Sequence, residues 1–249
     1  MDRLIEFADS AESPSLVRTR RGHRAYEVKF VLDEPTAAAV ERALSPSLAL
    51  DPHADSATGM YTIDTLYTDT PAWSVFFGEK LHAIRKYRIR RYGGGAIYLE
   101  RKMVRKSVVR KRRTATSTSD LESLIRRGGD GEAAWFVRQV DRDGLAPVCQ
   151  VSYNRRALFG QSDDGPMRVT FDRSIQGVPV SRWQFGTDLS TRTLLTNIVV
   201  CEFKFRDAMP GLMKRVVADL GLAPRRVSKY RACVSAFTSE LGLPENLHA

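Results

Sequence analysis

The sequence predicts an α+β fold, mainly antiparallel β, in which a closed eight-stranded barrel forms a tunnel and helices pack outside it. Roughly eight or nine segments alternate polar and apolar side chains with the two-residue period of strands. Several amphipathic helical segments need an apolar surface to cover. No shift in composition and no fixed-period repeat divides the 249 residues, so we expect one domain.

The expected elements follow from this periodicity and from turn residues. In chain order they are strand 24–30, helix 36–44, strand 61–69, helix 71–79, strands 83–92, 97–105 and 107–115, helices 118–127 and 131–140, strands 147–156, 166–173, 178–185 and 196–206, and helices 208–220 and 227–240. Pro35 supports the first helix, because proline favours the first helical turn. The glycines at 93–95 make a turn between two strands, and Gly128-Gly129 separates two helices.

Residues 23–240 form the expected barrel domain, between a flexible, polar leader at 1–22 and a C-terminal tail at 241–249. The leader lacks the apolar stretch of a signal peptide, and no run of about eighteen apolar residues indicates a membrane span. The three cysteines are widely separated and show no metal-ligand or disulfide spacing. Together these features favour a reducing, cytoplasmic location.

One face of nearly every expected strand is aromatic or aliphatic, and the other is mainly basic. The basic positions include Lys29, Lys86, Arg88, Arg90, Lys102, Lys111, Arg113, Arg155, Arg168, Lys204 and Arg206. For a single strand, such a pattern is the ordinary solvated face of an antiparallel sheet. Across seven strands, however, Arg and Lys dominate, whereas a solvated face usually mixes them with Ser, Thr and Gln.

The amphipathic helices need the apolar strand faces, so the helices lie outside and the charged faces turn toward one another. Two like charges about 4 Å apart repel by roughly 4 kcal/mol at an effective dielectric near 20. A cationic interior therefore needs anions, and the forked Arg side chain matches phosphate oxygens in pairs. The formal net charge of +10 also suits an anionic partner.

Four carboxylates interrupt the basic strand faces and would repel phosphate. They are Glu27, Glu100, Asp172 and Glu202. A divalent cation would resolve this conflict, because Mg²⁺ and Mn²⁺ bind hard oxygen ligands and bridge phosphate oxygens. Alternatively, each carboxylate pairs with a neighbouring Arg. The residues leave both readings open, and the metal reading is favoured most at Glu202.

An ordered set of motifs in these strands resembles the VTC domain. The motifs are Tyr26-Glu27-Val28-Lys29-Phe30, Leu66-Tyr67-Thr68-Asp69-Thr70, Arg85 to Tyr92, Tyr98 to Lys102, Val151 to Arg155, Cys201 to Phe205 and Ser228-Lys229-Tyr230. The VTC domain is the polyphosphate polymerase domain of the vacuolar transporter chaperone complex and belongs to the triphosphate tunnel metalloenzymes. The resemblance runs from about Arg24 to Phe237.

The resemblance implies a tunnel barrel whose basic residues hold a triphosphate. The implied phosphate contacts are Lys29, Arg88, Arg90, Lys102, Lys111, Arg113, Arg155 and Arg168. The resemblance implies that Glu202 holds Mn²⁺ or Mg²⁺ and that Lys229 lies near one tunnel mouth. The strand pattern adds Glu27, Glu100 and Asp172 as candidate ligands. The basic run 85–91 is dense, so its correspondence to the family positions stays open.

The leading interpretation is a metal-dependent polymerase that transfers the γ-phosphate of ATP to a growing polyphosphate chain. An inorganic or nucleoside triphosphatase on the same barrel is the alternative, since only the acceptor differs. The Glu-x-Glu-x-Lys start of the adenylyl cyclase and thiamine triphosphatase branch is incomplete here, because residue 25 is Ala.

A third interpretation is a non-catalytic polyphosphate- or RNA-binding module. The aromatic side chains alternate away from the charges, which is unlike the exposed stacking platform of a nucleic-acid-binding sheet, so no specific nucleic acid is expected. The sequence leaves the oligomeric state and any membrane partner protein open.

Overall fold

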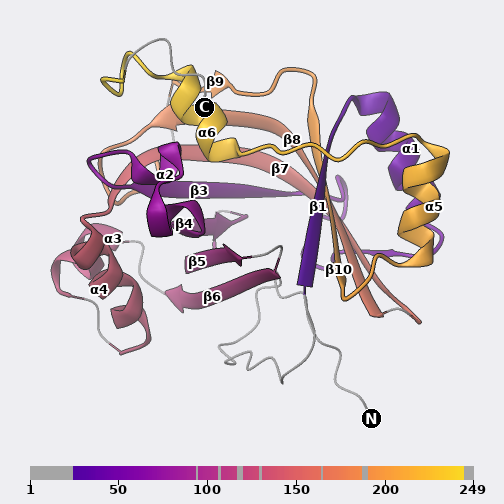
Figure 1. The fold of residues 1–249 in the computed structure, drawn as a ribbon, viewed down its shortest axis with the longest axis horizontal. Coiled ribbons are helices and arrows are strands. Elements are labelled where there is room, and N and C mark those ends of the chain that lie inside the picture. Colours follow the sequence, from indigo (N-terminus) through magenta and orange to yellow (C-terminus); the bar gives the residue numbers. More distant parts are fainter. Residues whose placement is uncertain are drawn as a thin grey trace.

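The computed structural model describes residues 25–93, 95–105, 108–116, 120–128, 131–163, 165–186 and 190–243. A strongly curled antiparallel sheet dominates the fold (Figure 1). Its long strands are β1 (Ala25–Leu32), β3 (Tyr61–Asp69), β4 (Arg85–Tyr92), β5 (Ile97–Arg105), β6 (Val108–Thr116), β7 (Ala146–Ser162), β8 (Gly165–Pro179) and β10 (Val199–Arg206). The two-residue strands β2 (Ala49–Leu50) and β9 (Arg192–Thr193) pair with β7 and β8.

The eight long strands follow the order β1-β10-β8-β7-β3-β4-β5-β6. Within the described residues, no ladder of hydrogen bonds joins the two end strands, β1 and β6. The curl nevertheless brings their Cα atoms within 8 Å of each other, and a side-chain ion pair links Lys102 on β5 to Glu27 on β1. The predicted class and the eight-stranded antiparallel sheet are confirmed, but the barrel is curled rather than closed by backbone pairing.

The helices are α1 (Glu34–Leu44), α2 (Ser74–Phe77), α3 (Leu121–Arg126), α4 (Ala134–Asp143), α5 (Gly211–Asp219) and α6 (Lys229–Ala236), with short 3₁₀ turns at Lys80–Ala83 and Gly131–Ala133. Helix α1 begins after Asp33, whose side chain accepts a hydrogen bond from the Thr36 N–H, and Pro35 occupies its first turn. None of the helices in the described ranges is both long and apolar enough to cross a membrane.

Four helices cover the convex side of the sheet, as expected. Helices α1 and α5 pack on β1, β8 and β10 through a core that includes Val40, Phe203 and Met213. Helices α3 and α4 pack on β4 and β5 through a second core that includes Leu99 and Phe136. Because the apolar strand faces supply both cores, the basic faces turn inward.

Helices α2 and α6 differ from the expectation that all helices lie outside. Helix α6 packs with Tyr67, Val151 and Tyr153, which share the concave face with the charged side chains. Gly177 permits this close approach, since a Cβ there would lie 2.5 Å from the Cys233 Sγ of α6. One end of the concave face is therefore apolar, and α6 fills it.

Asp69 joins three elements at this end of the sheet. Its buried carboxylate accepts hydrogen bonds from the N–H groups of Val75 (2.8 Å) and Phe76 (2.9 Å) in α2 and from the Tyr230 hydroxyl of α6. The buried carboxylate thus caps α2 and anchors the start of α6 to the end of β3. The position of Lys229, next to Tyr230, follows from this anchor.

Two expectations about the elements need correction. The predicted strand 178–185 is wrong, because β8 ends at Pro179 and the following Trp183 and Phe185 insert into the core beneath α4 instead of pairing with a strand. Strands β7 and β8 also extend beyond the predicted 147–156 and 166–173 as one long hairpin. The expected leader and residues 244–249 of the expected tail lie outside the described residues.

We predict that Tyr230→Phe destabilises the fold by about 1–3 kcal/mol, because Asp69 loses its hydroxyl donor while staying buried. Urea unfolding monitored by circular dichroism measures the change. Tyr26→Phe is the control, since the partly buried Tyr26 ring stacks on Phe205 on the convex side. Equal stability of the two variants would show that the Asp69 anchor adds nothing to the fold.

Candidate functional site

Basic side chains from seven of the long strands and from α6 meet on the concave face of the sheet. They are Lys29, Lys86, Arg88, Arg90, Lys102, Lys111, Arg113, Arg155, Arg168, Lys204 and Lys229. The cross-strand register places them on one surface, with Lys102 opposite Lys111 and Arg88 opposite Glu100. We call this surface the lumen.

Glu100 is the centre of one group of charges in the lumen. Its side chain is 0% exposed and lies 2.7 Å from Lys111 Nζ and 2.8 Å from Arg88 Nε. Arg113 and Arg90 lie slightly farther away, at 3.6 and 3.9 Å. Burial opposes ionisation of Glu100, but these four cations outweigh it and hold its pKa well below the usual value.

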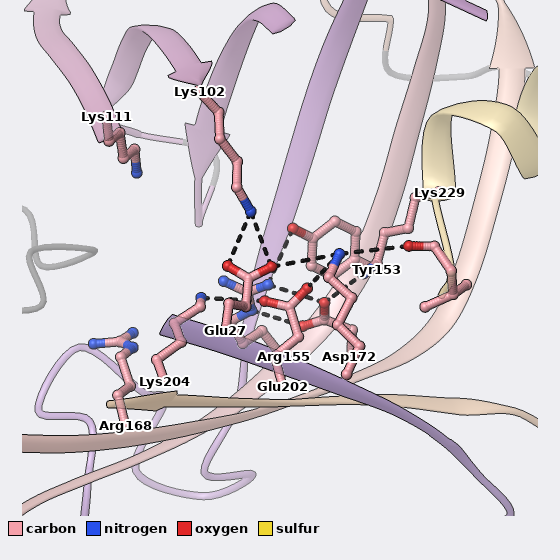
Figure 2. A network of polar contacts seen from close by, with 12 residues as sticks. Glu27, Lys102, Lys111, Tyr153, Arg155, Arg168, Asp172, Glu202, Lys204 and Lys229 are labelled. Carbon is pink, nitrogen blue, oxygen red and sulfur yellow. Dashed lines mark hydrogen bonds and ion pairs between the residues drawn. The ribbon is translucent and has the colours of Figure 1, made fainter. Parts of the chain in front are cut away.

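Glu27 and Glu202, on the neighbouring strands β1 and β10, form a second group. Lys102 Nζ lies 2.9 Å from both Glu27 oxygens (Figure 2). Lys29 bridges Glu27 (3.5 Å) and Glu202 (3.2 Å). Lys204 lies 3.2 Å from Glu202. Burial would raise the pKa of Glu202, but Lys29, Lys204 and other lysines hold it well below the usual value.

Asp172 forms a third group with Arg155 and Lys229. Arg155 donates to both carboxylate oxygens, at 2.6 and 2.9 Å, and Lys229 Nζ approaches to 2.6 Å (Figure 2). Burial disfavours the Asp172 carboxylate, yet these cations lower its pKa. Because Lys229 is the first residue of α6, this ion pair joins the helix to the lumen.

The lumen keeps an excess of positive charge despite these ion pairs. Lys86 shows this most clearly, since burial and then the nearby Arg231, Lys29 and Arg88 depress its pKa to about 8. Burial also lowers the pKa of Lys102 to about 8, although Glu27 opposes the shift. Burial is the larger cause of both shifts, and the cations around Lys86 add to it.

All the site residues predicted from the sequence lie on the lumen, but Arg168 stands apart from the three carboxylate groups. Its guanidinium donates to Asp51 (2.8 Å) and to the Tyr61 hydroxyl (3.1 Å). Asp51 lies in a loop without periodicity, so no sequence signal indicated it. Lys204 was recognisable, because it follows Glu202 by two residues on the same face.

The four predicted metal ligands are not equally suited to a metal ion. No group of three candidate ligands occurs in the described part of the chain. Glu100 and Asp172 are fully buried, and cations enclose each of them. Glu27 and Glu202 are less enclosed and lie near each other, and a pair of hard carboxylates fits Mg²⁺ or Mn²⁺, which take their remaining ligands from phosphate and water.

A family model described as the VTC domain matches residues 24–238. The chain belongs to the VTC domain family. Membership of this family supports an enzyme that acts on triphosphates. The comparison with curated proteins found no match for this VTC domain.

Two solved structures are similar to this VTC domain. The first is bh2851 of Bacillus halodurans, named a candidate adenylate cyclase, with 12% identity and a TM-score of 0.48 over 83% of this chain and 95% of that one. The second is PH1819 of Pyrococcus horikoshii OT3, with 11% identity and a TM-score of 0.45 over 85% of this chain and 99% of that one.

We predict that Glu100→Gln destabilises the protein by on the order of 3 kcal/mol, since it removes the negative charge that four cations surround. Thermal unfolding without ligand measures the loss. Glu34→Gln is the matched control, because Glu34 pairs with Arg173 at the surface, where its side chain is 62% exposed and the pair is worth less than about 1 kcal/mol. A loss no larger than in the control would contradict this role of Glu100.

Proposed function

We propose that this VTC domain is a metal-dependent polyphosphate polymerase that transfers the γ-phosphate of ATP to the end of a growing polyphosphate chain. The observation that carries the proposal is the convergence of basic side chains from seven strands on one concave surface. Family membership adds support. A linear chain of phosphates offers repeated negative charge along such a surface.

We propose two roles for the basic residues, according to how exposed their side chains are. Arg90 and Arg155 are held tightly, with side chains 5% and 3% exposed, and suit fixed contacts that orient the triphosphate. Lys29, Lys102 and Lys111 are about a quarter exposed. They would neutralise the charge that develops on the transferred phosphoryl group.

The acceptor in this reaction needs little help from a base. The second pKa of a terminal phosphate lies near 6, so its attacking oxygen is already ionised at neutral pH. A hydrolase would instead have to deprotonate water. The lowered pKa values of Glu100, Asp172 and Glu202 make these carboxylates weak bases, which supports phosphate rather than water as the acceptor.

Glu202 and Glu27 are the residues that would hold Mg²⁺ or Mn²⁺ in this proposal. The ion would act as a Lewis acid on phosphate oxygens. Lys29 and Lys204 now contact Glu202 and would turn toward the phosphates when a cation takes their place. Lys229 is fixed to Asp172 and would stay at the end of the lumen.

The test is to incubate the protein with ATP and Mn²⁺ and to separate the products by electrophoresis. Long polyphosphate supports the proposal. If orthophosphate is the only product, the protein is a triphosphatase instead. If neither product forms and the protein binds polyphosphate or RNA tightly, it is a binding module.

We predict that Glu202→Gln lowers turnover and Mn²⁺ affinity by roughly 10–100-fold, because a carboxylate ligand is replaced by an amide of the same shape. Titration of Mn²⁺ by electron paramagnetic resonance measures affinity separately from activity. Glu41→Gln, at an ion pair on the convex side, is the control for loss of a partly buried carboxylate. Unchanged Mn²⁺ affinity would remove Glu202 from the metal site.

We also predict that tripolyphosphate binding takes up protons near pH 8. Lys86, whose pKa lies at about 8, is partly neutral there in the free protein, and a bound anion favours its charged form. Affinity therefore falls as the pH rises through 8. Calorimetry in two buffers with different ionisation enthalpies measures the uptake, which Lys86→Met reduces and Lys214→Met, on the exposed side of α5, leaves unchanged. Equal uptake in both variants would contradict this role of Lys86.

A further inference from the structure

A cluster of arginines lies on the convex face of strands β4, β5 and β6, outside the lumen. Arg101 on β5 lies directly opposite Arg112 on β6, and Arg85 and Arg110 occupy the next position on the same face. Arg138 of α4 is close enough to lower the pKa of Arg112. We call these five residues the outer arginine cluster. Side chains alternate along a strand, so the cluster faces away from Lys102 and Lys111.

Like charges directly opposite each other destabilise an antiparallel pair, yet no carboxylate compensates Arg101 and Arg112 within the described residues. Asp143, whose charge acts on the neighbouring Tyr87, accepts hydrogen bonds from Gln139 and Arg142 of its own helix. The cluster therefore differs from the lumen, where buried carboxylates lie among the basic side chains and pair with them.

Two buried polar atoms at the base of the cluster also lack hydrogen-bond partners. They are the Nε atoms of Arg85 and Arg101, whereas the Tyr87 hydroxyl interacts with the Arg101 side chain. Tyr87 is only 2% exposed and lies directly opposite Arg101. A buried polar group without a partner costs about 1–3 kcal/mol. These atoms are an independent sign that an acceptor is missing at this position.

Arg112 is held in a geometry that suits an oxyanion. Its guanidinium lies 4.5 Å from the centre of the Trp135 ring, and Trp135 Nε1 donates to Thr114 Oγ1 at 2.9 Å, which fixes the ring. A guanidinium stacked on an aromatic ring keeps its forked N–H groups free at the edges. Arg112 is exposed, so a ligand can reach these groups from solvent.

We propose that Arg101 and Arg112 bind a phosphoryl group of a ligand on the outer face of the sheet, with Arg85 and Arg138 beside it. A phosphoryl group carries up to two charges and several acceptor oxygens, and it can therefore satisfy two guanidinium groups at once. The site lies on the opposite face from the lumen and does not depend on the polymerase reaction.

The fluorescence of Trp135 tests this site directly, because an anion on Arg112 changes the charge above the indole ring. We expect inorganic pyrophosphate to change the emission of the protein in a saturable way. The double variant Arg101→Gln/Arg112→Gln should weaken this response at least tenfold. Trp135→Phe should abolish the response, which would show that the response comes from Trp135 and not from Trp73 or Trp183. Arg42→Gln, an exposed arginine on α1, should leave it unchanged.

Two arms of the experiment distinguish a free phosphate ligand from a lipid headgroup. In the second arm, vesicles of phosphatidylcholine with about one-tenth phosphatidylinositol phosphate replace pyrophosphate, and phosphatidylcholine alone is the blank. If only pyrophosphate changes the fluorescence, and the double variant weakens that change, the ligand is a soluble phosphate. If the vesicles also change the fluorescence, and the double variant weakens that change too, the ligand is a lipid headgroup. No response in either arm, or an undiminished response in the double variant, would overturn the proposal.

Thermal unfolding separates ligand binding from a purely structural role. Without ligand, the double variant should unfold at the same or a higher temperature than the parent, because two repelling charges have been removed. Pyrophosphate should raise the unfolding temperature of Trp135→Phe, because this variant keeps both arginines. It should raise the unfolding temperature of the double variant by a smaller amount. A lower unfolding temperature in the double variant, with equal stabilisation by pyrophosphate in both, would overturn the proposal.

Discussion

The structure depends on the burial of carboxylates among cations on the concave face. Glu100, Glu202 and Asp172 are each held by two or more Lys or Arg side chains, and their pKa values fall despite burial. Without these anions, the repulsion among the basic side chains would oppose the curl that brings β1 close to β6. The carboxylates neutralise only part of the charge, so the lumen keeps a net positive charge.

The same interaction positions α6. The Asp172–Lys229 ion pair and the Asp69–Tyr230 hydrogen bond hold consecutive residues of this helix on two different strands. The Lys29 backbone carbonyl accepts from the Arg225 N–H, and Lys29 Nζ donates to the Val227 carbonyl. The segment before α6 is therefore tied to a lysine that also contacts Glu202.

Strand periodicity was sufficient to predict the sheet and its basic face, because alternation along a strand fixes the side on which a residue lies. It could not predict closure, which depends on how far the curled sheet carries β6 toward β1. Strand periodicity also led to the wrong prediction that α6 lies outside, because it did not reveal that Tyr67, Val151 and Tyr153 make part of the inner face apolar. Trp183 and Phe185 alternate like a strand, but in the described part of the chain no strand pairs with them, and both side chains pack in the core beneath α4. Asp51, in an aperiodic loop, gave no signal at all.

The convex face shows how this chain treats arginines that serve structure alone. Arg91 donates twice to Asp64, and Arg173 pairs with Glu34 and Glu41. Each of these arginines has a carboxylate within reach, because a cation on a sheet surface is best stabilised by a fixed anion nearby. Arg101 and Arg112 lie on the same convex face, opposite each other and without such a carboxylate within the described residues. Arg91 and Arg173 have carboxylate partners, whereas Arg101 and Arg112 on the same face do not. This difference is most simply explained if the anion for Arg101 and Arg112 comes from solution.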